Sequence, residues 1–151
     1  MSTQTIPAVE KSIVVSAPPE TAFRIFTSGA EGWWPLSTHS VHGARASLEF
    51  EARTGGRIVE RSAEGEEAVW GEVLESDPPR RIVFTWHPGY EGGTPPTEVE
   101  VTFTREGDGT RVVLVHTGWE GLGEERGPES REHYDQGWPV VLERYRQAAS
   151  S

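Results

Sequence analysis

His116 is the side chain that the sequence best suits to acid–base chemistry. It follows Val112 and Leu114 at a spacing of two, so on a β-strand all three side chains point to the same apolar face. Burial shifts the pKa of an imidazole, and a shifted pKa can suit the group for proton transfer. The sequence therefore predicts His116 as the candidate catalytic residue, with a hydrogen bond that secures the end of the strand as the alternative.

The remaining polar candidates carry a weaker signal. Four further residues are candidates for proton transfer: His39, Tyr134, Glu72 and Arg57. The five histidines also invite a metal-site hypothesis, but His39 and His42 suit joint ligation only on a helix, and Gly43 favours a loop there. The absence of cysteine excludes thiolate ligands, disulfides and cysteine nucleophiles. We therefore predict no metal and no cofactor.

Six tryptophans are the most distinctive feature of the composition. An indole offers a broad apolar face and one N–H donor, which suits the wall of a site for an organic molecule. The alternative is that these rings fill the core. Trp86 and Trp138 are the favoured pair, because the sheet face and the helix stripe should meet there. The residues predicted to line a ligand cavity are Trp33, Trp34, Phe50, Trp70, Phe84, Trp86, His116, Trp119, Tyr134, Trp138 and Val141.

The charge and the hydropathy pattern exclude several classes of partner. The formal net charge of −10 disfavours nucleic acid and anionic membrane surfaces, both of which need a basic face. Residues 1–10 lack the apolar core of a signal peptide, and no apolar run approaches the roughly 20 residues of a membrane span. We therefore expect a cytoplasmic protein with no nucleic-acid or membrane partner.

Strands must position most of these residues. Apolar and polar side chains alternate within segments that are bounded by glycine and proline, which is typical of half-buried strands. Strands are predicted at 10–16, 46–53, 57–61, 68–75, 82–87, 98–104 and 110–117. Within 68–75 the alternation places Trp70 and Leu74 on one face and Val69 and Val73 on the other. Because short turns join consecutive strands, the sheet should be antiparallel.

Helices are predicted on both sides of this run of strands. A short helix should begin at the prolines 18 and 19, with Ser16 or Ala17 at its cap, and a second short turn carries Trp33 and Trp34. The only long helix is predicted over 128–149. Its apolar stripe comprises Tyr134, Trp138, Val141, Leu142, Tyr145 and Ala149. One sheet and one long amphipathic helix indicate a single α+β domain over 9–149, preceded by a loose segment, 1–8.

An ordered series of short motifs resembles a known superfamily. The motifs are Ala17-Pro18-Pro19-Glu20, Gly55-Gly56-Arg57 with Glu60-Arg61, Trp70-Gly71-Glu72-Val73, the segment 77–86, Gly109-Thr110-Arg111-Val112, His116-Thr117-Gly118-Trp119, and Gly137-Trp138-Pro139 with Val141-Leu142. Over about residues 9–148 they resemble the SRPBCC superfamily, in its branch similar to the activator of the 90-kDa heat-shock-protein ATPase. The resemblance implies a helix-grip fold, like START domains and the birch-pollen allergen: a curved antiparallel sheet wrapped around the C-terminal helix, with a deep apolar cavity between them.

Three functions follow as hypotheses. The first is binding of a small hydrophobic or aromatic molecule in that cavity, without catalysis. The second is a cofactor-independent cyclase or dehydratase acting on a polyketide-like substrate, because the superfamily includes such enzymes. The third is a co-chaperone-like interaction module, which is disfavoured because the similar eukaryotic co-chaperone has a further N-terminal domain for which we expect no room here. A homodimer is the default expectation for a small domain.

Overall fold

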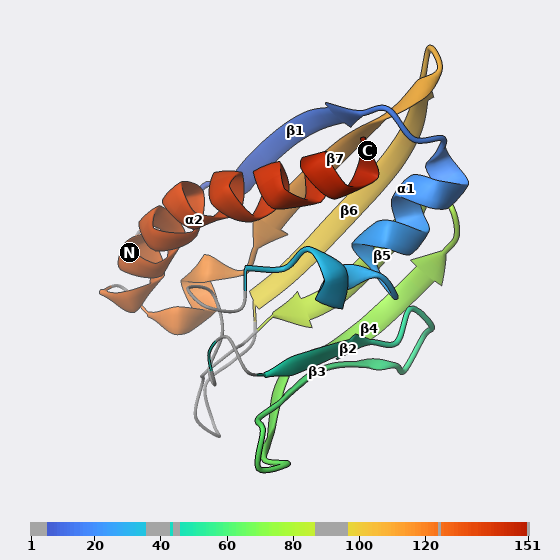
Figure 1. Cartoon of the computed structure of the whole chain (residues 1–151). Helices are drawn as coiled ribbons and strands as arrows, with labels where there is room; N and C mark the ends of the chain where they lie inside the picture. Colours follow the sequence, from blue (N-terminus) through green and yellow to red (C-terminus); the bar gives the residue numbers. More distant parts are fainter. Residues whose placement is uncertain (1–5, 36–42, 44–45, 87–96, 124, 151) are drawn as a thin grey trace.

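Seven antiparallel strands curl around a long C-terminal helix (Figure 1). The computed structural model describes residues 6–35, 43, 46–86, 97–123 and 125–150. The strands are β1 (Val9–Val15), β2 (Ser47–Phe50), β3 (Arg57–Arg61), β4 (Glu67–Asp77), β5 (Arg81–Trp86), β6 (Thr97–Glu106) and β7 (Gly109–Thr117). The helices are α1 (Pro19–Phe26) and α2 (Arg126–Ala149), with 3₁₀ turns η1 (Ala30–Gly32) and η2 (Trp119–Leu122). The predicted α+β fold is confirmed.

The sheet has the order β1-β7-β6-β5-β4-β3-β2. From β2 to β7 each strand pairs with the next one in the sequence, whereas β1 joins the opposite edge beside β7. The tightest connection is the β6–β7 turn, where Glu106 pairs with Gly109 and Gly107 takes a φ of +61° that favours glycine. The α1 and η1 segment therefore carries the chain from one edge of the sheet to the other, on the face that α2 covers (Figure 1).

Helix α1 begins later than predicted. Its N-cap is Pro18, which has extended backbone angles, and Pro19 is the first helical residue. The prediction of Ser16 or Ala17 as the cap is therefore wrong. The physical reason is that Pro19, with its fixed helical φ and no N–H to satisfy, is preorganised as the first helical residue, which places the cap one residue before it. The buried rings of α1 then pack edge-on against Phe103 of β6, at centroid distances of 5.2 Å from Phe23 and 5.8 Å from Phe26.

Helix α2 lies across the concave face and presents the predicted stripe to the sheet. Five of the six stripe residues are buried: Trp138, Val141, Leu142, Tyr145 and Ala149. The sixth, Tyr134, is half-buried. The hydroxyl of Tyr145 donates to the carbonyl oxygen of Ala22 at 2.8 Å, and its burial raises the pKa of Tyr145. This bond joins α2 to α1 inside the core.

Strand β4 departs from the predicted alternation. Trp70 and Val73 are both buried in the core, at 1% exposure each, whereas Leu74 is 43% exposed. The assignment of Trp70 and Leu74 to one face is therefore wrong. The register shifts within both pairings of β4, once at Ile58/Val59 of β3 and once at Val73/Glu75. A β-bulge inserts an extra residue and so exchanges the faces beyond it.

The residues just before β1 are tied to the C-terminal half. The amide of Ile6 donates to a carboxylate oxygen of Glu120 at 3.1 Å, and the guanidinium of Arg131 donates to the carbonyl oxygens of Pro7 and Ala8, each at 3.1 Å. The boundary between a segment 1–8 and a domain 9–149 stays a prediction. Within the described ranges, no helix is long and apolar enough to cross a membrane.

Candidate functional site

His116 occupies the centre of a hydrogen-bonded chain beneath α2. The indole Nε1 of Trp138 lies 3.0 Å from the Nδ1 of His116. Because an indole N–H can only donate, Nδ1 accepts, and the neutral ring carries its proton on Nε2. Nε2 lies 2.6 Å from the hydroxyl of Thr97 and donates to it; that hydroxyl donates in turn to the carbonyl oxygen of Trp86 at 2.8 Å. One chain of bonds thus links α2, β7, β6 and β5.

The surroundings of His116 keep it neutral. The side chain is fully buried, and this burial lowers the pKa of His116 to about 3. The rings of Trp119 and Tyr134 pack against the imidazole, at centroid distances of 4.1 and 5.0 Å. Both nitrogens are committed within the protein, so a ligand could reach either one only by breaking an existing bond. The geometry matches the alternative role, a hydrogen bond that secures the end of the strand.

Four indoles meet beside this chain, and we call Trp34, Trp70, Trp86 and Trp138 the tryptophan cluster. The centroid of Trp34 lies 5.0 Å from that of Trp70 and 5.6 Å from that of Trp86. Trp86 lies 5.5 Å from Trp70 and 5.4 Å from Trp138. The four rings come from the segment after η1, from β4, from β5 and from α2, so the cluster spans the space between the sheet and the long helix.

Exposure differs sharply within the tryptophan cluster. Trp70, Trp86 and Trp138 are only 1–3% exposed, whereas Trp34 is half-buried. Trp34 contacts each of the other three rings, since its centroid also lies 6.1 Å from that of Trp138. It is therefore the most exposed ring of the tryptophan cluster.

Glu60 is a polar residue of this region that sequence reasoning missed. Its side chain is fully buried on β3, and an oxygen of its carboxyl group accepts a hydrogen bond from the Nε1 of Trp70 at 2.9 Å. Within the described part of the chain it is the only acidic side chain that is fully buried. A signal was present: Glu60 follows the core residue Ile58 by two positions, so alternation places both on the inner face.

The other predicted cavity residues fall into two groups. Phe84 lies near the tryptophan cluster, Trp119 and Tyr134 pack against His116, and Phe50 and Val141 are buried in the same core. Phe84 lies 5.7 Å from Trp86 and is stacked edge-on by Phe50 at 5.3 Å. Trp33 borders the tryptophan cluster, with its ring centroid 5.5 Å from that of Trp34. It also lies between Phe26 and Tyr145, at 5.8 and 5.2 Å, and donates its N–H to the carbonyl oxygen of Ile25. Trp33 thus secures η1 to α1.

Of the weaker catalytic candidates, Tyr134 lies at the site, against the ring of His116, whereas Arg57 and Glu72 do not. Arg57 and Glu72 pair with each other across β3 and β4, and both are exposed. His39 lies outside the described residues, as do His42 and His87. Among the residues that the structure describes, no group of three or more histidine, aspartate or glutamate side chains could hold a metal ion.

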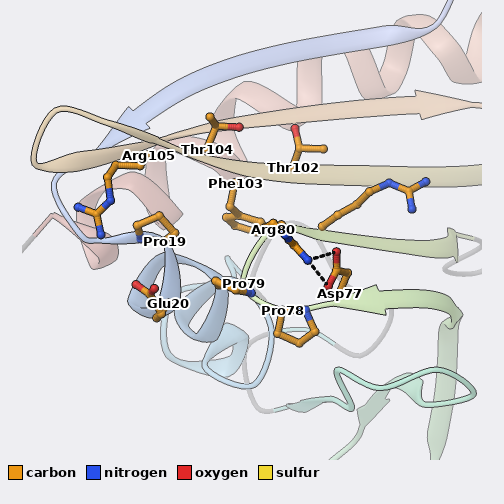
Figure 2. A pocket seen from close by; sticks show the side chains of 11 residues that line it. Pro19, Glu20, Asp77, Pro78, Pro79, Arg80, Thr102, Phe103, Thr104 and Arg105 are labelled. Atoms are coloured by element: carbon orange, nitrogen blue, oxygen red, sulfur yellow. Dashed lines mark hydrogen bonds and ion pairs between the residues drawn. The ribbon is translucent and has the colours of Figure 1, made fainter.

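A groove with a volume of about 680 Å³ lies at the opposite end of the sheet (Figure 2). The first turn of α1, the β4–β5 turn and the strand β6 form its walls. Its lining mixes apolar residues, such as Pro79 and Phe103, with charged ones. Arg80 faces Asp77 across the rim in an exposed ion pair of 3.1 Å (Figure 2). The groove contains none of the predicted cavity residues and is separate from the tryptophan cluster.

The matches to known proteins agree with this architecture. Residues 16–149 match the family model described as Activator of Hsp90 ATPase homolog 1-like protein. The solved structure of Txn09, an anthrahydroquino-γ-pyrone synthase complexed with SUM, is 37% identical over 97% of this chain and 99% of that one, with a TM-score of 0.65. CalU16 from Micromonospora echinospora is 25% identical over 93% of this chain and 78% of that one, with a TM-score of 0.61.

A more distant structure shows the same fold. The Aha1 dimer from Colwellia psychrerythraea is 18% identical over 96% of this chain and 97% of that one, with a TM-score of 0.70. No curated protein sequence matches the chain significantly. The family match covers most of the chain and confirms the resemblance that the motifs indicate. The chain belongs to the family of activator of Hsp90 ATPase homolog 1-like proteins, which has the SRPBCC-type helix-grip fold.

Proposed function

We propose that this protein binds a planar aromatic molecule at the tryptophan cluster, between the sheet and α2. The observation that carries the proposal is the convergence of four indole rings with centroid distances of 5.0–6.1 Å. Aromatic side chains in such arrangements bind flat ring systems through offset or edge-on stacking, worth about 0.5–1.5 kcal/mol per pair beyond the area buried. An aliphatic ligand would gain burial but not this stacking.

The ligand enters at Trp34 in this proposal. Trp34 is the half-buried member of the cluster and contacts all three buried members, so a flat ligand that stacks on Trp34 joins the same group of rings. The net charge of −10 disfavours a strongly anionic ligand. A neutral, polycyclic molecule of polyketide type fits both constraints.

A thermal-shift experiment tests the binding proposal. Xanthone, flavone and palmitate would be compared, the last as an aliphatic control. At 100 times its dissociation constant a ligand adds about 2.7 kcal/mol, which raises the Tm of a domain of this size by roughly 5–10 °C. Trp34→Ala should weaken aromatic binding at least tenfold, whereas Leu74→Ala, on an exposed part of β4, should leave it unchanged. Flat curves for every aromatic compound, with the protein folded, would refute the proposal.

Formation of a γ-pyrone ring is the second candidate function. The observation that favours it is the 37% identity, over nearly the whole chain, to a protein named as an anthrahydroquino-γ-pyrone synthase. An ortho-hydroxyaryl 1,3-diketone closes to a γ-pyrone when its phenolic oxygen adds to the distal carbonyl carbon. The phenol and the methylene between the carbonyls each lose one proton, and the carbonyl oxygen leaves as water. The reaction needs no oxidant and no cofactor.

Glu60 is the residue that we propose for proton transfer in this reaction. Its carboxyl group is fixed by Trp70, which packs against Trp86 in the tryptophan cluster. A positioned carboxylate can take the phenolic or methylene proton and return it to the leaving oxygen. Mass spectrometry of a 2-hydroxyaryl 1,3-diketone incubated with the protein would show loss of 18 mass units, the mass of water. Glu60→Gln should reduce the rate at least about a hundredfold, whereas the exposed Glu72→Gln should not.

The oligomeric state, the partners and the cellular location are further proposals. The family includes a protein solved as a dimer, and we propose that this chain can also form a homodimer. Light scattering coupled to size exclusion would decide between one and two copies. We propose that the protein is located in the cytoplasm. We expect that nucleic acids, membranes and chaperones are not its partners.

A further inference from the structure

Trp86 differs from the other buried indoles in its hydrogen bonding. Four of the five buried tryptophans donate their N–H to an acceptor: Trp33 to Ile25, Trp70 to Glu60, Trp119 to the carbonyl of His116, and Trp138 to its ring. The Nε1 of Trp86 is buried and has no hydrogen-bond partner in the described structure. Trp86 itself is 3% exposed, so bulk solvent does not supply the acceptor.

Leaving this donor unpaired is costly. A buried donor without an acceptor loses about 1–3 kcal/mol relative to a satisfied one. The ring of Trp86 contacts the rings of Trp34, Trp70, Phe84 and Trp138. Indole and phenyl side chains offer no lone pair as an acceptor, so none of these four can pair with the N–H of Trp86. An N–H directed at a ring face recovers only part of this loss. An unsatisfied group of this kind in a native core calls for an explanation in function.

Trp86 is also held in place before any ligand arrives. Its carbonyl oxygen accepts the hydroxyl of Thr97, which is in turn bonded to His116. Its backbone pairs with Thr97 in the β5–β6 ladder, and its ring is packed on several sides. The donor is therefore preorganised, so little conformational entropy of the protein is lost when a ligand accepts its hydrogen bond.

We infer that Trp86 Nε1–H is the specificity-determining donor of the aromatic site and that its acceptor is a carbonyl oxygen on the ligand's ring system. The ligand class is thereby narrowed to planar aromatic ketones, quinones and pyrones, and hydrocarbons or ligands that only donate are disfavoured. The inference rests on the proposed binding function. Of the three buried rings of the tryptophan cluster, Trp70 already donates its N–H to Glu60, and Trp138 already donates its N–H to His116.

A matched pair of ligands and a matched pair of proteins test this inference. The ligands are 9-fluorenone and fluorene, planar three-ring molecules that differ in the carbonyl oxygen. The proteins are the natural chain and a variant with 3-benzothienylalanine at position 86, which keeps the bicyclic ring shape and replaces the N–H by sulfur. Equilibrium dialysis gives the four dissociation constants. The ratio of the fluorenone and fluorene dissociation constants is taken for each protein, and the two ratios are compared. Because the cost of desolvating the ketone is common to both proteins, this comparison isolates the contribution of the hydrogen bond.

The expected result is a loss confined to the ketone. The variant should bind fluorenone about three- to tenfold more weakly, the worth of one hydrogen bond, and fluorene within twofold of the natural chain. Equal changes for both ligands would overturn the assignment of Trp86 as donor while leaving aromatic binding intact. Failure of the natural chain to bind either ligand would overturn the site itself, and with it this inference.

A packing control separates the donor from the shape of the cluster. Phe84→Leu alters a fully buried ring 5.7 Å from Trp86 without touching any N–H. It should weaken fluorenone and fluorene by the same factor. If Phe84→Leu instead discriminates between the two ligands as strongly as the variant at position 86, the preference for a carbonyl comes from packing and the inference is wrong.

Discussion

The Nε1 of Trp138 and the Nδ1 of His116 lie 3.0 Å apart and join the long helix to the last strand inside the core. The bond fixes the protonation of the imidazole, because an N–H aimed at Nδ1 excludes a second proton there. It also determines the direction of the next bond, from Nε2 to Thr97. One contact between a helix and a strand thus sets a chain of donors and acceptors that ends at Trp86.

This relationship makes stability depend on pH. Burial lowers the pKa of His116 from 6.5 to about 3. Between these two values His116 is protonated in the unfolded chain and neutral in the folded chain. Stability is therefore full above pH 6.5 and falls as the pH drops from 6.5 towards 3, by up to about 1.4 kcal/mol per pH unit. Urea unfolding between pH 7 and 5 should show this slope, and His116→Gln should reduce it. An unchanged slope in the variant would contradict the assignment.

The window above pH 5 is chosen to isolate the histidine. Hydrogen bonds and ion pairs lower the pKa of three carboxyl groups, those of Glu51, Asp135 and Glu143. Their stabilisation is present above their unfolded pKa values and is lost in more acidic solution, so it adds to the acid loss. Between pH 7 and 5 these groups remain mostly charged in both states, and the difference in slope between the natural chain and His116→Gln reports His116.

Removal of the Trp138 side chain should be strongly destabilising. Trp138 is 2% exposed, contacts Trp86 and Tyr134, and donates to His116. Trp138→Ala should lower the free energy of unfolding by about 3–5 kcal/mol, because it removes a large buried ring and leaves a cavity. Val140→Ala, at a position of α2 that is 49% exposed, should change it by less than about 0.5 kcal/mol. Similar effects of the two changes would show that the helix face has been misplaced.

Thr97 should contribute more to the stability of the fold than the small size of its side chain indicates. Its hydroxyl is the link between Nε2 of His116 and the carbonyl oxygen of Trp86. Thr97→Val keeps the shape but leaves a buried donor on His116 without an acceptor, at a cost of about 1–3 kcal/mol. Thr104→Val, on an exposed position of the same strand, is the matched control. Chemical denaturation of both variants measures the difference, and a neutral Thr97→Val would mean that the chain of bonds does not form.

Gly71 should be the glycine of the sheet that least tolerates a side chain. A Cβ at Gly71 would lie 1.7 Å from the carbonyl oxygen of Thr85, so β4 and β5 would have to separate. Gly71→Ala should therefore cost at least about 3 kcal/mol or prevent folding. Gly32→Ala meets no atom within 4 Å and should be close to neutral in thermal unfolding. Equal Tm values for the two variants would contradict this close approach of the strands.

The sequence predicted the elements better than it predicted which polar groups meet. Alternation placed His116 inward with Val112 and Leu114, and helical spacing placed Trp138 on the buried stripe, as the structure has them. It failed on β4, because bulges exchange the faces there; Gly71, a glycine inside the strand, is the signal that strict alternation passed over. The bond between Trp138 and His116, and the one between Trp70 and Glu60, depend on sheet curvature and helix placement, which periodicity does not contain.

The pairing of β1 with β7 has a consequence for how the chain is made. Val9 pairs with His116 and Val15 with Thr110, so the first strand to leave the ribosome has its neighbour in the last one. Hairpins from β2 to β7 can form in the order of synthesis, whereas β1 must wait until β7 has emerged. Contacts so distant along the sequence slow folding. We expect the nascent protein to complete its sheet only once β7 has been synthesised, with the edge of β1 exposed to chaperones until then.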